Sequence, residues 1–64
     1  MWVQIKSAPN KMIADMWKDF FEGEGIPTRI LPDSDKLEMK EMVPYKIYVS
    51  QERVHVVEEV LRKL

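Results

Sequence analysis

Hydrophobic and polar residues alternate along three short stretches of the chain, at about residues 2–7, 26–31 and 43–49. A period of two residues predicts strands that bury one face. In the first stretch, Val3 and Ile5 share the side expected to be buried. The opposite, uncovered side of the resulting sheet is expected to carry Trp2, Gln4, Lys6, Lys46 and Tyr48.

Two longer stretches, at about residues 11–24 and 51–64, instead space their apolar residues as amphipathic helices do. Asn10 and Ser50 precede them and are residue types that cap helix N-termini, and Gly25 suits the left-handed backbone that ends a helix. The apolar faces are expected to pack into the core, and they contain Met12, Ile13, Met16, Trp17, Phe20 and Phe21 in the first helix, and Val54, Val57, Val60, Leu61 and Leu64 in the second.

This order of elements predicts an α+β fold with a β-α-β-β-α layout, in which residues 1–64 form a single domain. The third strand is expected to insert between the first two, which gives a three-stranded antiparallel sheet of order 1-3-2 in a ferredoxin-like split β-α-β arrangement. Both helices then lie on one face of the sheet. The complete version of this fold has a fourth strand beside the first, so the first strand is expected to form a bare edge.

Two aromatic residues, Trp2 and Tyr48, are expected on the uncovered face of this sheet. Each would leave on the order of 100 Å² exposed, in a domain small enough to bury only about 60% of its unfolded surface. We therefore expect a homodimer or higher oligomer, formed through the uncovered face at Trp2, Gln4, Lys46 and Tyr48 or through the edge of the first strand. The alternative is a monomer with two tolerated surface aromatics.

The segment 32–42 joins the second and third strands, and the sequence pattern leaves its conformation open. It begins with a cluster of turn-forming residues and continues with apolar residues among charges. Methionines in such settings are used at surfaces that accept partners, and the alternative is that Leu37 and Met42 fold back over the edge of the core. The candidate partner-binding residues are Asp33, Asp35, Leu37, Met39 and Met42.

Composition narrows the classes of partner. The chain has no cysteine and a formal net charge of −1, so no basic excess exists to neutralise phosphates of nucleic acid or anionic lipids. The absence of cysteine favours a reducing compartment, and no apolar run approaches the roughly 20 residues of a membrane span. We expect a cytoplasmic protein that binds neither nucleic acid nor membrane.

Candidate chemistry is sparse in this sequence. His55 has Glu52 three residues before it, a spacing that can hold a metal or form a general base, but an exposed histidine on a charged helix face is the preferred interpretation. An EF-hand loop starting at Asp33 would need glycine at its sixth position and an acid at its twelfth, where Glu38 and Pro44 stand instead. We therefore expect no catalytic residue, no metal site and no cofactor.

Four segments carry a resemblance that covers nearly the whole chain: Ala8-Pro9-Asn10, Trp17 to Phe21, Glu24-Gly25-Ile26-Pro27, and Val43-Pro44-Tyr45-Lys46-Ile47-Tyr48-Val49 before a valine-rich helix. The chain resembles a small bacterial family of unknown function that is named as a prokaryotic signal-transducing protein. The resemblance implies a fold related to the nitrogen-regulatory PII proteins, which carry an interaction loop at the position of residues 32–42. No stretch matches the nucleotide-binding loops of PII proteins, so ATP binding is not carried over.

Two functional hypotheses follow from the sequence. The first is a non-catalytic interaction or regulatory module that self-associates and presents residues 32–42 to a partner. The alternative is a small-ligand sensor whose pocket forms between subunits, with Lys6, Arg29 and Lys46 as candidate anion contacts.

Overall fold

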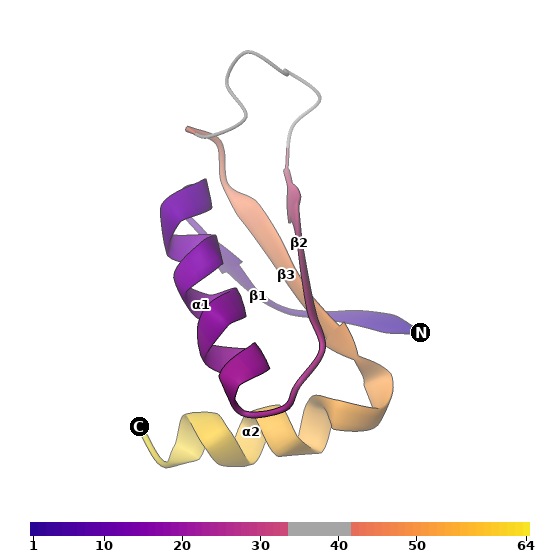
Figure 1. Ribbon diagram of the computed structural model, residues 1–64. Helices are drawn as coiled ribbons and strands as arrows, with labels where there is room; N and C mark the ends of the chain where they lie inside the picture. Colours follow the sequence, from indigo (N-terminus) through magenta and orange to yellow (C-terminus); the bar gives the residue numbers. More distant parts are fainter. Residues whose placement is uncertain (34–41) are drawn as a thin grey trace.

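The computed structural model of the chain describes residues 1–33 and 42–64. It confirms the predicted α+β order of elements (Figure 1). The elements are β1 (Trp2–Ala8), α1 (Lys11–Gly23), β2 (Thr28–Pro32), β3 (Tyr45–Ser50), the 3₁₀ turn η2 (Gln51–Arg53) and α2 (Val54–Arg62).

The three described strands form one antiparallel sheet in the order β1-β3-β2, as predicted. Tyr45, Ile47 and Val49 of the central strand β3 are all buried, so one face of the sheet is covered. In Figure 1, α1 runs along the sheet and α2 lies across the end of the molecule, where α1 turns into β2. Apolar side chains of both helices join the single core cluster on the covered face.

Both ends of α1 are fixed by the residues that the sequence indicated. The side-chain oxygen of Asn10 accepts a hydrogen bond from the Ile13 amide at 2.9 Å. At the other end Gly25 has a φ of 81°, its amide donates to the Glu22 carbonyl, and the Ile26 amide donates to Phe21, both at 3.0 Å. This pair of bonds is the Schellman arrangement, which requires a left-handed residue at Gly25.

The second helix starts differently from the prediction. Ser50 makes no side-chain capping hydrogen bond, because residues Gln51–Arg53 form a 3₁₀ turn before α2 begins at Val54. Leu64, which was expected in the buried stripe, is 74% exposed beyond the end of α2. Of the predicted apolar face, Val57 is buried and its apolar neighbours in α2 are partly buried against the core.

The apolar arc of α1 is wider than the surface it covers. Ala14 and Phe21 lie on the side of α1 that faces the core and are fully buried. Met12 and Met16 are 68% and 61% exposed. The expectation that Met12 and Met16 belong to the core is therefore wrong. A helix touches a sheet along one stripe only, so residues on the far side of a wide apolar arc stay uncovered.

Strand β1 contains a β-bulge that the alternating pattern did not reveal. The register shifts between Gln4 and Lys6, so that Ile5 has no partner and Lys6 stands opposite Ile47 on the covered face. The Nζ atom of Lys6 lies 4.6 Å from the centre of the Trp17 ring. The prediction that Lys6 points to the uncovered face is wrong, because an inserted residue reverses the side on which all later residues of a strand lie.

Candidate functional site

The uncovered face of the sheet carries aromatic, apolar and cationic side chains from all three strands. In one row Tyr48 of β3 stands between Gln4 of β1 and Arg29 of β2. In the next row Lys46 of β3 stands beside Leu31 of β2, which is exposed. We call this surface the open face, and it is defined by Trp2, Gln4, Arg29, Leu31, Lys46 and Tyr48.

Trp2 lies on the open face and is 42% exposed. It pairs with Ser50 of the central strand, yet its ring lies 5.0 Å from the guanidinium carbon of Arg29, on the strand beyond. The contact therefore passes across β3. Stacking of a guanidinium on an indole is worth about 0.5–1 kcal/mol at an exposed site, so the Trp2 ring is held across the face. Trp2, Gln4, Lys46 and Tyr48 thus share the face that the sequence indicated.

One ion pair anchors the corner of the open face next to the segment 32–42. Lys46 Nζ lies 3.3 Å from a carboxylate oxygen of Asp33, with both side chains about half exposed. The Asp33 amide also donates to the Pro44 carbonyl at 2.8 Å. A pair this exposed adds at most about 1 kcal/mol, and its main effect is to hold the two ends of the segment together. The predicted partner-binding residues Asp35, Leu37 and Met39 lie outside the described residues.

The three cations proposed for an anion site are not brought together. Arg29 and Lys46 lie on neighbouring strands of the open face, one row apart. Lys6 lies on the covered side, over Trp17. The Arg29 guanidinium lies over the Trp2 ring and the Lys46 amine lies beside Asp33, so these two charged groups contact different residues of the open face.

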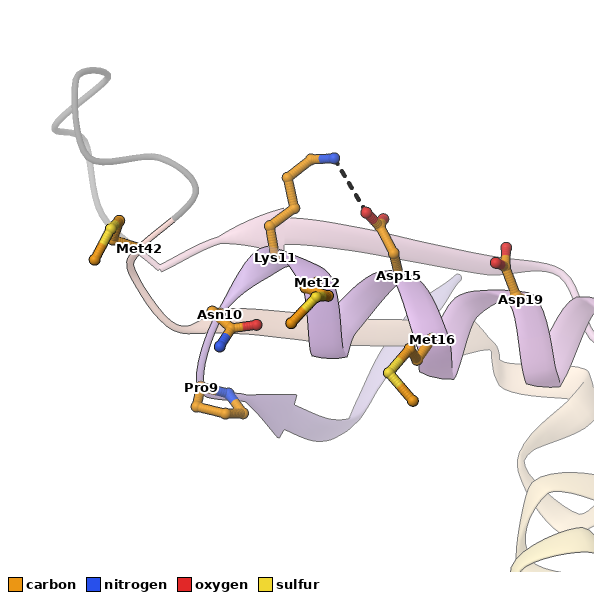
Figure 2. A pocket seen from close by; sticks show the side chains of 8 residues that line it. All are labelled: Pro9, Asn10, Lys11, Met12, Asp15, Met16, Asp19 and Met42. Atoms are coloured by element: carbon orange, nitrogen blue, oxygen red, sulfur yellow. Dashed lines mark hydrogen bonds and ion pairs between the residues drawn. The ribbon is translucent and has the colours of Figure 1, made fainter.

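A second uncovered surface runs along the outer side of α1, away from the sheet. An open hollow of about 670 Å³ lies there, between the start of α1 and the residue where the described chain resumes before β3 (Figure 2). Met42, at that point, is 76% exposed, so the alternative that it folds back over the edge of the core is wrong for Met42, while Leu37 lies outside the described residues. The hollow is lined by Pro9, Asn10, Lys11, Met12, Asp15, Met16, Asp19 and Met42.

An apolar hollow of about 320 Å³ adjoins the first one along α1, with Met16 lining both. Its lining residues are Ile13, Met16, Trp17, Phe20 and Leu64. We call the two hollows together the α1 groove. Sequence reasoning missed it by assigning the methionines of α1 to the core. The available signal was the width of the apolar arc, which exceeds what one sheet face covers.

Two polar groups of potential chemical interest, the His55 imidazole and the Tyr45 hydroxyl, lie within residues 1–33 and 42–64. His55 is exposed on α2, as the sequence indicated, and no group of three metal-ligating side chains occurs in this part of the chain. The hydroxyl of Tyr45 is buried and has no hydrogen-bond partner among these described residues. None of the helices described is long and apolar enough to cross a membrane.

Comparison with known proteins identifies no relative of this chain. No protein-family model, no curated protein and no solved structure matches the chain, so its resemblance to the signal-transducing family stays a prediction.

Proposed function

We propose that this protein is a non-catalytic interaction module that self-associates through its open face and presents the segment 32–42 to a partner. The observation that carries the proposal is the open face itself, where Trp2, Leu31 and Tyr48 lie on the side of the sheet opposite the core. Exposed apolar patches with polar neighbours are typical of protein interaction sites.

The residue types on the open face suit a protein–protein interface. Trp, Tyr and Arg are the side chains that most often dominate binding energies, and Trp2, Tyr48 and Arg29 lie together on this face. A standard interface buries about 800 Å² on each partner, which is roughly a sixth of the 4685 Å² surface of this chain.

The structure favours the open face over the edge of β1 as the route of association. Pairing of two edges needs a regular row of free backbone groups, and the bulge at Ile5 interrupts that row in the middle of β1. Bulges of this kind are a common protection of sheet edges against pairing. Association through the open face does not depend on that row of backbone groups, because it uses side chains that project from all three strands.

The test is the mass of the protein in solution, measured by light scattering or sedimentation over a range of concentrations. The wild type is expected to exceed the monomer mass of 7.6 kDa, and the double variant Trp2→Ser with Tyr48→Ser is expected to return to it. The matched control is Met12→Ser, which removes an exposed apolar side chain from the other surface. A wild type that stays monomeric, or a control that dissociates as fully as the double variant, would refute the proposed route.

A small-ligand sensor is the second candidate, and one observation favours it. Arg29 and Lys46 share the open face, so two copies meeting through this face would bring four cations together. An anion bound between the copies would raise the melting temperature, because it binds only the folded state. Nucleotides, amino acids and 2-oxo acids are suitable probes, and any shift is expected to disappear in Arg29→Gln. A panel without any shift counts against the sensor and leaves the interaction module.

A further inference from the structure

We infer that the α1 groove binds an amphipathic helix of another protein that carries basic side chains along one flank. The inference rests on the proposed function in one respect, namely that the chain works by binding partners. It concerns a different surface, since the outer side of α1 and the open face lie on opposite sides of the sheet.

The groove has two parallel rows of side chains along α1. Met12, Met16 and Phe20 recur every four residues and form an apolar row. Lys11, Asp15 and Asp19, also spaced four residues apart, form a charged row beside it, as Figure 2 shows for the first turns of α1. Residues four apart lie above one another on a helix, so both rows run along the helix axis.

Such a surface fits a second helix better than an extended peptide. An amphipathic helix presents apolar residues every three or four positions and packs them into a groove of matching spacing. Unbranched methionine side chains adapt to the shape of what they contact. The open sides of Trp17 and Leu64 lengthen the apolar floor at the other end of the groove.

The charge of the groove selects a basic partner. Its hollow near the start of α1 is lined by two carboxylates and one amine. The Lys11 amine lies 3.1 Å from an Asp15 carboxylate oxygen, whereas Asp19 forms no ion pair with any of the residues the structure describes. A lysine or arginine of the partner would reach Asp19 when its apolar side chains lie on Met16 and Phe20.

The experiment uses three synthetic peptides with the wild-type chain and its variants. The first is a 14-residue helix-forming peptide of leucine and lysine, about four turns long, with its leucines on one face. The second has glutamate in place of every lysine, and the third is a scrambled form of the first. Binding is followed by the fluorescence of Trp17 in a Trp2→Phe background, where Trp17 is the only tryptophan left.

We expect the leucine–lysine helix to bind at least tenfold more tightly than either control peptide. Asp19→Lys and, separately, Met16→Lys are each expected to weaken this binding about tenfold. The matched control is Glu59→Lys, which makes the same charge change on the exposed side of α2 and is expected to leave the affinity unchanged. Equal binding of the lysine and glutamate peptides, or equal effects of Asp19→Lys and Glu59→Lys, overturns the inference.

Other occupants of the groove would give different results. If Met16→Lys lowers the mass of the protein in solution, a second copy occupies the groove and the inference is overturned. Binding to neutral lipid vesicles that Met16→Lys abolishes, without binding of the leucine–lysine helix, overturns it in favour of a membrane surface. The Trp2→Ser with Tyr48→Ser variant separates this inference from the proposed self-association, because it is expected to lose oligomers and still bind the peptide.

Discussion

The two uncovered surfaces described above differ in the stiffness of their apolar side chains and in the charged groups that lie beside them. The open face carries aromatic rings fixed on a strand ladder and bordered by cations, with Trp2 stacked on Arg29. The α1 groove carries the flexible side chains of Met12 and Met16 beside the carboxylate of Asp19. Both surfaces leave apolar area exposed, but they do so with side chains of different physical character.

This difference indicates two kinds of recognition. Aromatic side chains have few rotatable bonds and lose little conformational entropy when they are buried, which suits one fixed partner surface such as a second copy. Methionines pay more side-chain entropy but adapt to varied shapes. The comparison therefore predicts a specific self-contact on the sheet and a tolerant contact on α1.

The strongest way to break the comparison is to remove the core that supports both surfaces. Phe21 is fully buried between α1 and the sheet, and Phe21→Ala is expected to destabilise the fold by about 3–5 kcal/mol. Urea unfolding followed by circular dichroism measures the change. Both surfaces should be lost together, because α1 and the sheet share this one core. The matched control is Phe20→Ala, which removes a partly buried ring and should cost less.

The end of α1 offers a more selective test. Gly25→Ala places a side chain at a φ of 81° and is expected to cost about 1 kcal/mol, since only glycine adopts this conformation freely. The helical Gly23 is the control, because Gly23→Ala meets no neighbouring atom and exchanges a poor helix former for a good one. Gly23→Ala should therefore stabilise the protein slightly. Hydrogen exchange should show the α1 end opening in Gly25→Ala while the sheet amides stay protected.

The two tyrosines of β3 sharpen the contrast between the covered and the open face of one strand. The Tyr45 hydroxyl is buried without a hydrogen-bond partner in the part of the chain that the structure describes, and such a group costs about 1–3 kcal/mol. Tyr45→Phe is accordingly expected to raise the free energy of unfolding by about 1 kcal/mol. Tyr48→Phe, on the open face, should change it little. A loss of stability in Tyr45→Phe would show that the hydroxyl has a bonding partner in solution.

The smallest expected change in stability concerns Lys6. Its substitution tests whether this residue lies outside the open face. Its ammonium lies over the Trp17 ring, and Lys6→Glu is expected to destabilise the fold by about 0.5–1 kcal/mol through loss of this contact. Lys6→Met, which keeps the apolar cover of the ring, should be closer to neutral. Neither variant should alter the mass in solution, because Lys6 does not lie on the open face. A change in mass would assign Lys6 to the self-association surface after all.

Local sequence patterns were reliable where each residue's role depends on its near neighbours. The cap at Asn10 and the stop at Gly25 are confirmed because both work through hydrogen bonds within a few residues. The strand order is confirmed as well, because the crossover through α1 places β1 and β2 in the same direction and β3 can pair antiparallel with both when it lies between them. The cap at Ser50 failed because a 3₁₀ turn, which the residue types do not distinguish from an α-helical turn, follows it.

The two candidate surfaces were harder to predict than the helix ends, because they depend on contacts between residues that are distant in the sequence. The residues that β1 and β3 contribute to the open face could be predicted from alternation in β3 and in the first residues of β1, up to Gln4, whereas Arg29 and Leu31 of β2 were not assigned to it. The bulge at Ile5 could not be predicted, because it exists only in the pairing of β1 with β3. For the same reason the α1 groove was missed, since the periodicity of α1 shows how wide its apolar arc is and not which part of it meets the sheet.

The sequence by itself determined the elements, their order and the residues that begin and end α1, because these follow from backbone preferences and hydrophobic period. The tertiary structure alone decided that Lys6 turns inward and that Met12 and Met16 stay exposed. Burial is a property of neighbours in space, and a period along the chain does not say which neighbours a side chain meets.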